Sequence, residues 1–343
     1  MGNTLALNQQ RWIDTMQALV VTQFGETPAM QIETRVIPQA KPGYSLLKMH
    51  AATVNPLSNQ IRLGAVPTAQ APLVLSNDGS GTVVSSEKFT DGQQVAVYGG
   101  GSLGITEDGL QQEYALVANK WIVPLPEGVS LDDAAALPIN YVSAYQAIHR
   151  VGQLQPGQVA LVSGATGSLG HALIQLINVM GAVPIAIVST SAKVANAARS
   201  GAHAVIDLSA HNLIEQAHEL TNGKGADFAF DTVAGELLGP MLKSLKTRGT
   251  LVAIGFAGGV TPAIDIVDVV VHEKKLLGFD AHLETDADVA TTFDELNRLL
   301  VLNKIKPRID SKFPLAEYHQ AYSHLMSRKA QGTILLTFNS SQE

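Results

Sequence analysis

Three glycines spaced three residues apart, Gly164, Gly167 and Gly170, follow a short apolar run and precede a helical pattern. A strand, a tight glycine turn and a helix N-terminus together form an anion cradle, because small residues let the backbone approach a pyrophosphate. The spacing differs from the strict Gly-x-Gly-x-x-Gly, and glycine also ends strands where no ligand binds. Because a strand precedes and a helix follows, we expect the turn to bind a dinucleotide through Gly164, Ala165, Thr166, Gly167, Ser168, Leu169 and Gly170.

The segment after the next predicted strand indicates which dinucleotide to expect. An NAD site places Asp or Glu about 20 residues past the glycine turn, where it binds the ribose 2′-hydroxyl. This chain has Ser189, Thr190 and Ser191 there, followed by Lys193. Because hydroxyls and an ammonium bind a 2′-phosphate that a carboxylate would repel, the segment favours NADPH over NADH. The alternative is that Lys193 is a solvated lysine in the first turn of a helix.

The elements that position these residues change in character along the chain. The first half has short, Val-rich runs bounded by turn residues, which predict strands at 18–23, 45–54, 81–85 and 94–98. A helical region opens at 131–136, and helical segments then alternate with apolar strands at 160–163, 184–189, 204–207, 228–231 and 250–254. This rhythm predicts an α/β fold with a doubly wound parallel sheet, beside a β-rich domain to which a last strand at 333–338 returns.

Composition and charge exclude several classes of protein. The 343 residues are 46% hydrophobic and 15% charged, so the chain can bury a large core over about two domains. The net charge is −7 without a basic run, so we expect neither a nucleic acid nor an acidic membrane as partner. The absence of cysteine excludes disulfides and thiolate zinc sites, and residues 1–15 lack the apolar core of a secretory signal. We therefore expect a cytoplasmic protein with no membrane span.

Several segments, in order, resemble a known family: VNPLSNQIRLG at 54–64, NDGSGTV at 77–83, AAALP at 134–138, and also 16–25, 124–128, 230–233 and 249–255. The chain resembles the zinc-independent medium-chain dehydrogenases/reductases of the quinone oxidoreductase type over nearly its whole length. The resemblance implies an N-terminal extension at 1–15 and a GroES-like substrate domain at 16–135, completed by 306–343. It also implies a Rossmann cofactor domain at 136–305 and assembly as a homodimer or homotetramer.

The resemblance also bears on metals and on the residues of the cleft. Zinc-dependent relatives place Cys, His and Glu near the positions of Asn55, Ser76 and Asn77, so no metal is expected here. Asn55 falls where the family meets the nicotinamide and the substrate, although Asn-Pro is also a common turn. Gln60 stands where some relatives have a tyrosine, and Ser143 lies in the segment that resembles the family's cofactor-contacting helix start.

Two phenols and one strand end complete the candidate site. Tyr98 ends a strand before three glycines, and Tyr141 lies beside Ser143; for both, packing in the core is the alternative to catalysis. Gly255 and Phe256 close a later strand, where their backbone can approach the nicotinamide.

The expected reaction is hydride transfer from NADPH to a quinone or an α,β-unsaturated carbonyl, with Asn55, Gln60, Tyr98 and Tyr141 as catalytic candidates. Proton delivery from water would suit these acceptors, since their reduced products are already stabilised. One alternative is a zinc-free alcohol or aldehyde oxidoreductase. Another is a non-catalytic NADPH-binding sensor or scaffold.

Overall fold

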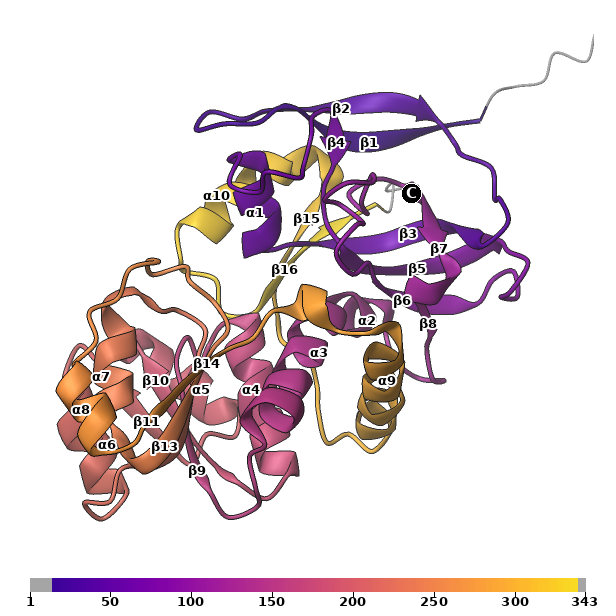
Figure 1. Cartoon of the computed structure of the whole chain (residues 1–343). Coiled ribbons are helices and arrows are strands. Elements are labelled where there is room, and N and C mark those ends of the chain that lie inside the picture. Colours follow the sequence, from indigo (N-terminus) through magenta and orange to yellow (C-terminus); the bar gives the residue numbers. More distant parts are fainter. Residues whose placement is uncertain (1–13, 339–343) are drawn as a thin grey trace, which may run out of the picture.

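Six parallel strands form the sheet of the second domain in the computed structural model, which describes residues 14–338 (Figure 1). Their order is β11-β10-β9-β12-β13-β14. The strands are β9 (Val159–Val162), β10 (Val183–Val188), β11 (Ala204–Asp207), β12 (Ala226–Asp231), β13 (Leu245–Ala253) and β14 (Lys275–Gly278). The winding direction reverses between β9 and β12, and such a switch point is where ligands bind in open parallel sheets.

Helices cover both faces of this sheet because successive side chains of its strands point to opposite sides. Ala160 and Val162 of β9 pack in one cluster with residues of α3, α4 and α9, whereas Leu161 packs in another with α6 and α7. The helices of this domain are α3 (Pro138–Gln146), α4 (Ser168–Val179), α5 (Val194–Arg199), α6 (Leu213–Leu220), α7 (Leu238–Lys243), α8 (Ile266–Val271) and α9 (Asp286–Val301). The predicted doubly wound sheet is confirmed.

The first domain is β-rich and contains two sheets. One has three strands, β1 (Thr15–Gln23), β2 (Ala29–Val36) and β4 (Leu73–Val74). The other combines early strands with two from the end of the chain: β3 (Tyr44–Val54), β5 (Asp78–Ser85), β6 (Gln94–Tyr98), β7 (Tyr114–Ala118), β8 (Ile122–Pro124), β15 (Ile309–Pro314) and β16 (Thr333–Thr337). Three helices complete the domain, α1 (Pro56–Arg62), α2 (Leu131–Ala136) and α10 (Tyr318–Met326).

The C-terminal segment returns to the first domain because β16 pairs antiparallel with β3 and parallel with β15. Figure 1 shows this yellow segment running between the two domains, with α10 beside α1. The proposed N-terminal extension, residues 1–15, lies almost entirely outside the described residues. Among residues 14–338, no helix is both long and apolar enough to cross a membrane.

Candidate active site

The glycine turn packs so closely that two of its glycines leave no room for a side chain. Gly164 has a φ of +56°, and a Cβ there would lie 2.3 Å from Thr232 Oγ1. A Cβ on Gly170 would lie 2.2 Å from the carbonyl oxygen of Gly164. Gly164 therefore allows the turn to approach the end of β12, and Gly170 allows α4 to pack directly on the turn.

The N-terminus of α4 is open to an anion. Gly167 is its N-cap residue, and no side chain caps the helix. Backbone N–H groups in the first turn have no partner within a helix, and within residues 14–338 no loop carbonyl accepts from Ser168, Leu169 or Gly170. Ala165 and Thr166, which belong to the turn, are buried. Free N–H groups beside a glycine-lined approach fit the pyrophosphate of a dinucleotide.

The end of β10 carries the residues expected to select the cofactor. Lys193 Nζ lies 3.4 Å from Ser189 Oγ, and none of the ion pairs among residues 14–338 includes Lys193. Thr190 is exposed beside it. Ser191 Oγ instead donates a hydrogen bond to Asp207 Oδ2. Asp207, which the sequence analysis missed, stands at the end of the neighbouring strand β11. Hydrogen bonds from Ser191 and Ser209 lower its pKa and so favour the carboxylate form.

Thr232 joins the glycine turn to the predicted nicotinamide side of the sheet. Its Oγ1 donates to the Ser163 carbonyl at 3.0 Å. A Cβ on Gly255 would lie 2.4 Å from the Thr232 carbonyl oxygen, so the end of β13 approaches the same residue. Phe256 is 53% exposed at this edge. The ends of β9, β12 and β13 therefore meet around Thr232, as ligand-binding edges of parallel sheets do.

Asp231, at the end of β12, is a structural residue in this arrangement. Its Oδ1 accepts from Ser163 Oγ at 2.6 Å and from the backbone N–H groups of Val233 and Ala234 at 2.9 and 3.0 Å. The carboxylate is buried and fixes the loop that follows β12.

On the first domain, Asn55 is held by its neighbours on both ends of its amide group. It is the N-cap of α1, and its Oδ1 accepts from the Ser58 N–H at 2.8 Å. Its Nδ2 donates to Thr53 Oγ1 and to Asp78 Oδ1, both at 3.1 Å. The Nδ2 hydrogens face the protein interior, which leaves the second lone pair of Oδ1 as the free bonding position of this amide. Gln60, on the same helix, is half-buried.

Asp78 is a buried carboxyl group that the sequence analysis did not single out. It is fully buried, its Oδ1 accepts from Thr53 Oγ1 and Asn55 Nδ2, and its Oδ2 finds no hydrogen-bond partner in the described part of the chain. Burial raises its pKa to about 7, although hydrogen bonds from Thr53 and Asn55 act in the opposite direction. Asn77 beside it is also buried, with an unpartnered Nδ2. The orientation of Asn55 therefore depends on a carboxyl group that titrates near neutral pH.

Tyr141 and Ser143 are less accessible than the sequence suggested. Tyr141 is 1% exposed within the core of the second domain, and its hydroxyl donates to Gln175 Oε1 at 2.6 Å. The expectation of a cleft phenol at Tyr141 is wrong, because α3 directs this side chain toward α4. Ser143, also on α3, is 6% exposed.

Tyr98 lines a cavity of about 190 Å³ between the two domains, together with Trp121, His282 and Glu284. Its hydroxyl donates to the Ala281 carbonyl at 3.3 Å. Burial and the nearby charge of Glu284 raise the pKa of Tyr98, so it is a poor proton donor near neutral pH.

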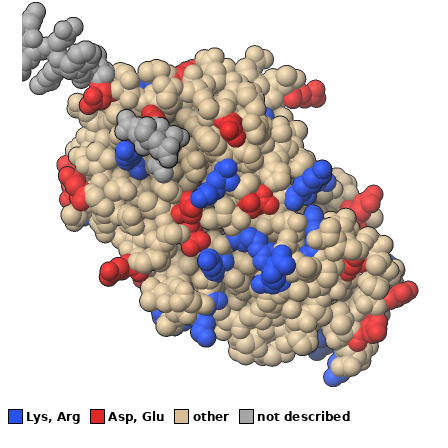
Figure 2. Space-filling model, turned by 180° about the vertical axis from the view of Figure 1, so that it is seen from behind, with Lys and Arg blue, Asp and Glu red and all other residues tan. Residues whose placement is uncertain are grey.

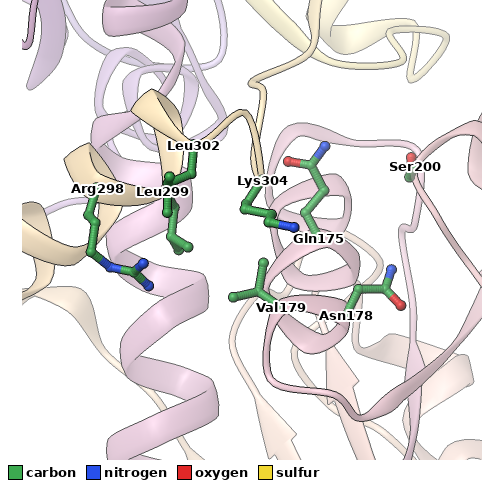
Figure 3. A pocket seen from close by; sticks show the side chains of 8 residues that line it. All are labelled: Gln175, Asn178, Val179, Ser200, Arg298, Leu299, Leu302 and Lys304. Atoms are coloured by element: carbon green, nitrogen blue, oxygen red, sulfur yellow. The ribbon is translucent and has the colours of Figure 1, made fainter.

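A larger cavity, of about 450 Å³, lies elsewhere on the second domain (Figure 3). Residues from the C-terminal half of α4 line it, including Gln175 and Asn178, opposite Leu299 and Leu302 from the end of α9. At 1.5 Å per residue, Asn178 lies about 16 Å along α4 from Gly167. This cavity is therefore separate from the phosphate cradle.

The positive charge of the chain is unevenly distributed. Figure 2 shows Lys and Arg side chains gathered in the middle of the rear face. Arg308 Nη1 donates to the Asn196 carbonyl of α5, and burial together with Arg199 lowers the pKa of Arg308. Within residues 14–338 neither arginine belongs to an ion pair. The region around α5 therefore carries local positive charge despite the acidic total.

Asn55, Ser76 and Asn77, which stand near the positions where zinc-dependent relatives have their ligands, are not themselves zinc ligands of the usual kinds. In the described part of the chain, no group of three or more His, Asp or Glu side chains is arranged to hold a metal ion.

Comparisons with known proteins match both domains. Residues 41–127 match the family described as alcohol dehydrogenase GroES-like domain, and residues 168–298 match the family described as zinc-binding dehydrogenase. The chain is 30% identical over 264 residues to a quinone oxidoreductase-like protein 2 homolog of Nematostella vectensis, which covers 75% of this chain and 72% of the relative. It is 28% identical over 331 residues to quinone oxidoreductase of Mus musculus, and the match covers 94% of this chain and 98% of the relative. A mycobacterial structure complexed with NADPH superposes with a TM-score of 0.85 at 25% identity, and the match covers 94% of this chain and 99% of that structure.

Proposed function

Because the chain belongs to the medium-chain dehydrogenase/reductase family, with quinone oxidoreductases among its relatives, we propose that it uses NADPH to reduce a quinone or an α,β-unsaturated carbonyl compound. The observation that carries the proposal is the uncapped, glycine-lined N-terminus of α4, together with the cation of Lys193, which belongs to no ion pair among residues 14–338. NADPH, when bound, would supply the hydride. The first turn of α4 would hold its pyrophosphate, and Ser189 and Lys193 its 2′-phosphate.

The first domain supplies the other wall of the proposed site. Thr53 and Asp78 accept hydrogen bonds from Asn55 Nδ2 and so fix the orientation of the amide group. The Asn55 Oδ1 would then accept a hydrogen bond from a donor group of the cofactor or the substrate. A quinone or enone needs no metal to stabilise its reduced form, because the negative charge is delocalised over the product. Tyr98 is a poor acid here, so the proton would come from water.

Turnover measurements with the full chain test the proposal. NADPH oxidation should be measured with 1,2-naphthoquinone, 9,10-phenanthrenequinone and a series of short enones, and with a simple ketone and aldehyde for comparison. We expect turnover of the quinones or enones and little of the ketone or aldehyde. Tight NADPH binding with no turnover across the series would instead support a sensor or scaffold, and preferential turnover of the aldehyde would support the zinc-free alcohol or aldehyde oxidoreductase.

Replacing Lys193 by alanine should weaken NADPH binding at least about tenfold and leave NADH binding nearly unchanged. The reason is that a charge-assisted hydrogen bond contributes about 1.5–3 kcal/mol, and only NADPH carries the 2′-phosphate. Dissociation constants for both nucleotides, measured by fluorescence titration, check this prediction. Lys224→Ala, at an exposed position on the same domain, serves as a control. Equal losses for the two nucleotides with Lys193→Ala would contradict the proposed NADPH preference.

We further propose that two copies of the chain pair through β14. This strand is the last in its sheet, and no strand among residues 14–338 pairs with its outer edge. The neighbouring helix α8 exposes Ile266, Val267, Val270 and Val271, each at least 65% exposed. An unpaired sheet edge and an exposed apolar helix face are usually covered by another chain. Antiparallel pairing of β14 with a second β14 about a two-fold axis would cover the edge in both copies.

The double variant Val267→Asp, Val270→Asp should convert the dimer to a monomer, because four carboxylates would be placed in the symmetric interface. Analytical ultracentrifugation at micromolar concentration measures the change. Val36→Asp, at a similarly exposed valine on the first domain, should leave the dimer intact. A wild-type protein that sediments as a monomer would refute the pairing.

A further inference from the structure

The cavity of about 450 Å³ beside the C-terminal half of α4 lies where the chain crosses from the second domain to the first. Residues 302–308 make this crossing, because they connect α9 to β15. Lys304, in the crossing segment, lines the cavity together with Gln175 of α4, and Figure 3 shows its side chain extending toward α4. Small-molecule sites usually enclose about 300–1,000 Å³, so this cavity has the size of a ligand site.

Lys304 gives the cavity a positive charge with which no carboxylate in the described part of the chain forms an ion pair. Arg298 also lines the cavity, but it donates two hydrogen bonds to Glu295, at 2.7 and 2.6 Å, so its charge is balanced. Arg308 belongs to the crossing segment, and Arg199 lies close enough to it to lower its pKa. The local charge therefore favours an anion in this cavity.

The amide group of Gln175 is held in one orientation by two donors. Its Oε1 accepts from the Tyr141 hydroxyl at 2.6 Å and from the backbone N–H of Lys306 at 3.0 Å. Both contacts use the oxygen, so Nε2 is the end of the amide left for another partner, and it can only donate. A fixed amide donor and an ammonium on the same cavity suit the two acceptor oxygens of a carboxylate.

The remaining wall of the cavity is apolar and partly open to solvent. Val179, the last residue of α4, is 38% exposed, and Leu302, which follows α9, is 51% exposed. Leu299 lies between them in the lining and is buried. An apolar group of a ligand would gain free energy by covering Val179 and Leu302, whereas inorganic phosphate has no such group. The lining is therefore suited to a ligand with one anionic and one apolar end.

We propose that this cavity is a second ligand-binding site, for a small organic carboxylate whose anionic group contacts Lys304 and Gln175 and whose apolar part covers Val179 and Leu302. It is separate from the dinucleotide site of the proposed function, since it lies about 16 Å along α4 from Gly167.

A carboxylate in this site would tie the crossing segment more firmly to α4. Lys306 already attaches the segment, because its carbonyl accepts from His171 Nε2 at 2.9 Å and its N–H donates to Gln175. A carboxylate held by Lys304 and Gln175 together would add a further contact between the segment and the helix that carries the phosphate cradle. We therefore expect the bound carboxylate to raise the urea midpoint of the protein.

Calorimetric titration of the full chain with benzoate, octanoate, acetate and inorganic phosphate, at constant ionic strength, tests this assignment. Benzoate and octanoate should bind saturably, one per chain, with dissociation constants of about 1 mM or below. Acetate and phosphate should bind at least about tenfold more weakly, because they cover little apolar surface.

Two lysine variants locate the bound carboxylate. Lys304→Ala should weaken benzoate binding at least about tenfold, because it removes the charged donor. Lys306→Ala removes an exposed cation two residues away that does not line the cavity, and it should change the affinity less than about twofold. Because both side chains are exposed, both variants should keep the wild-type urea midpoint in the absence of ligand.

The outcomes also separate this site from the proposed function. No saturable binding of benzoate or octanoate, or equal affinity in Lys304→Ala and the wild type, would overturn the site, and so would equal losses in the two lysine variants. Phosphate that binds as tightly as benzoate would overturn the carboxylate class. Mutually exclusive binding of benzoate and NADPH would place the carboxylate in the dinucleotide site instead. A chain that binds benzoate through Lys304 but binds no nucleotide would refute the proposed function and support this site.

Discussion

Replacing Gly170 by alanine should strongly weaken dinucleotide binding and destabilise the second domain. The added Cβ would lie 2.2 Å from the Gly164 carbonyl oxygen and 2.8 Å from Ala165 Cα. Both are backbone atoms of the turn, so α4 must move away from the phosphate cradle to relieve the overlap. Forced overpacking of this kind costs about 1–3 kcal/mol, and the displaced N–H groups would no longer converge on an anion.

Gly167→Ala is the matched control for this variant. Gly167 has a φ of −72°, and a Cβ there would meet only the Gly164 carbonyl oxygen, at 3.3 Å. We expect Gly170→Ala to raise the dissociation constant of NADPH about a hundredfold or more and to lower the urea midpoint. Gly167→Ala should lower the urea midpoint much less. Comparable affinity in Gly170→Ala and the wild type would show that the dinucleotide does not bind at this turn.

Replacing Asp78 by asparagine should stabilise the protein above neutral pH. The folded protein holds the pKa of Asp78 at about 7 against a reference of 3.8, because burial disfavours the carboxylate. Below pH about 4 both the folded and unfolded states hold the proton, so the carboxyl group imposes no penalty there. Between pH about 4 and 7 only the unfolded state loses its proton, so the stability of the wild type falls as the pH rises.

Above pH about 7 this penalty is constant, and at 1.36 kcal/mol per pKa unit it is on the order of 4 kcal/mol. An asparagine Oδ1 can accept the hydrogen bonds from Thr53 and Asn55 but carries no charge, so the variant escapes the penalty. The free energy of unfolding of Asp78→Asn should therefore exceed that of the wild type at pH 8, with a smaller difference at pH 5. Urea unfolding at several pH values measures it.

Asp294→Asn, at an exposed carboxylate on α9, should follow the wild-type pH profile. Turnover by Asp78→Asn should persist, because the substituted side chain still fixes Asn55. A stability difference that is the same at pH 5 and pH 8 would mean that Asp78 stays ionised in the folded protein throughout this range.

Helices and strands that depend on the pattern of apolar residues along a short segment were predicted closely from the sequence. The strands at 94–98 and 204–207 and the helix at 131–136 coincide with β6, β11 and α2. The Val- and Ala-rich strands of the parallel sheet are buried on both faces, so they appear as continuous apolar runs. By contrast, β2 was not predicted, because its charged side chains, such as Glu33 and Arg35, interrupt the apolar pattern.

The predictions for the glycine turn and for the Ser189–Lys193 segment each rest on a short stretch whose backbone or charge requirement is local. Tyr141 was misjudged because its position near a family motif says nothing about which way α3 faces once it packs on α4. Asp78 was missed because burial raises its pKa, and the burial arises only when β5 pairs with β3, which also brings Thr53 against it.

The sequence by itself determined that this chain has a β-rich domain, a doubly wound domain and a glycine turn before a helix, because periodicity and glycine spacing act over a few residues. Only the tertiary structure decided what faces that turn. Lys193 and Arg328 are 135 residues apart along the chain, and they meet because β16 pairs with β3 and returns the C-terminal segment to the junction of the domains. Contacts between such distant residues depend on which strands pair, and local sequence carries no record of that choice.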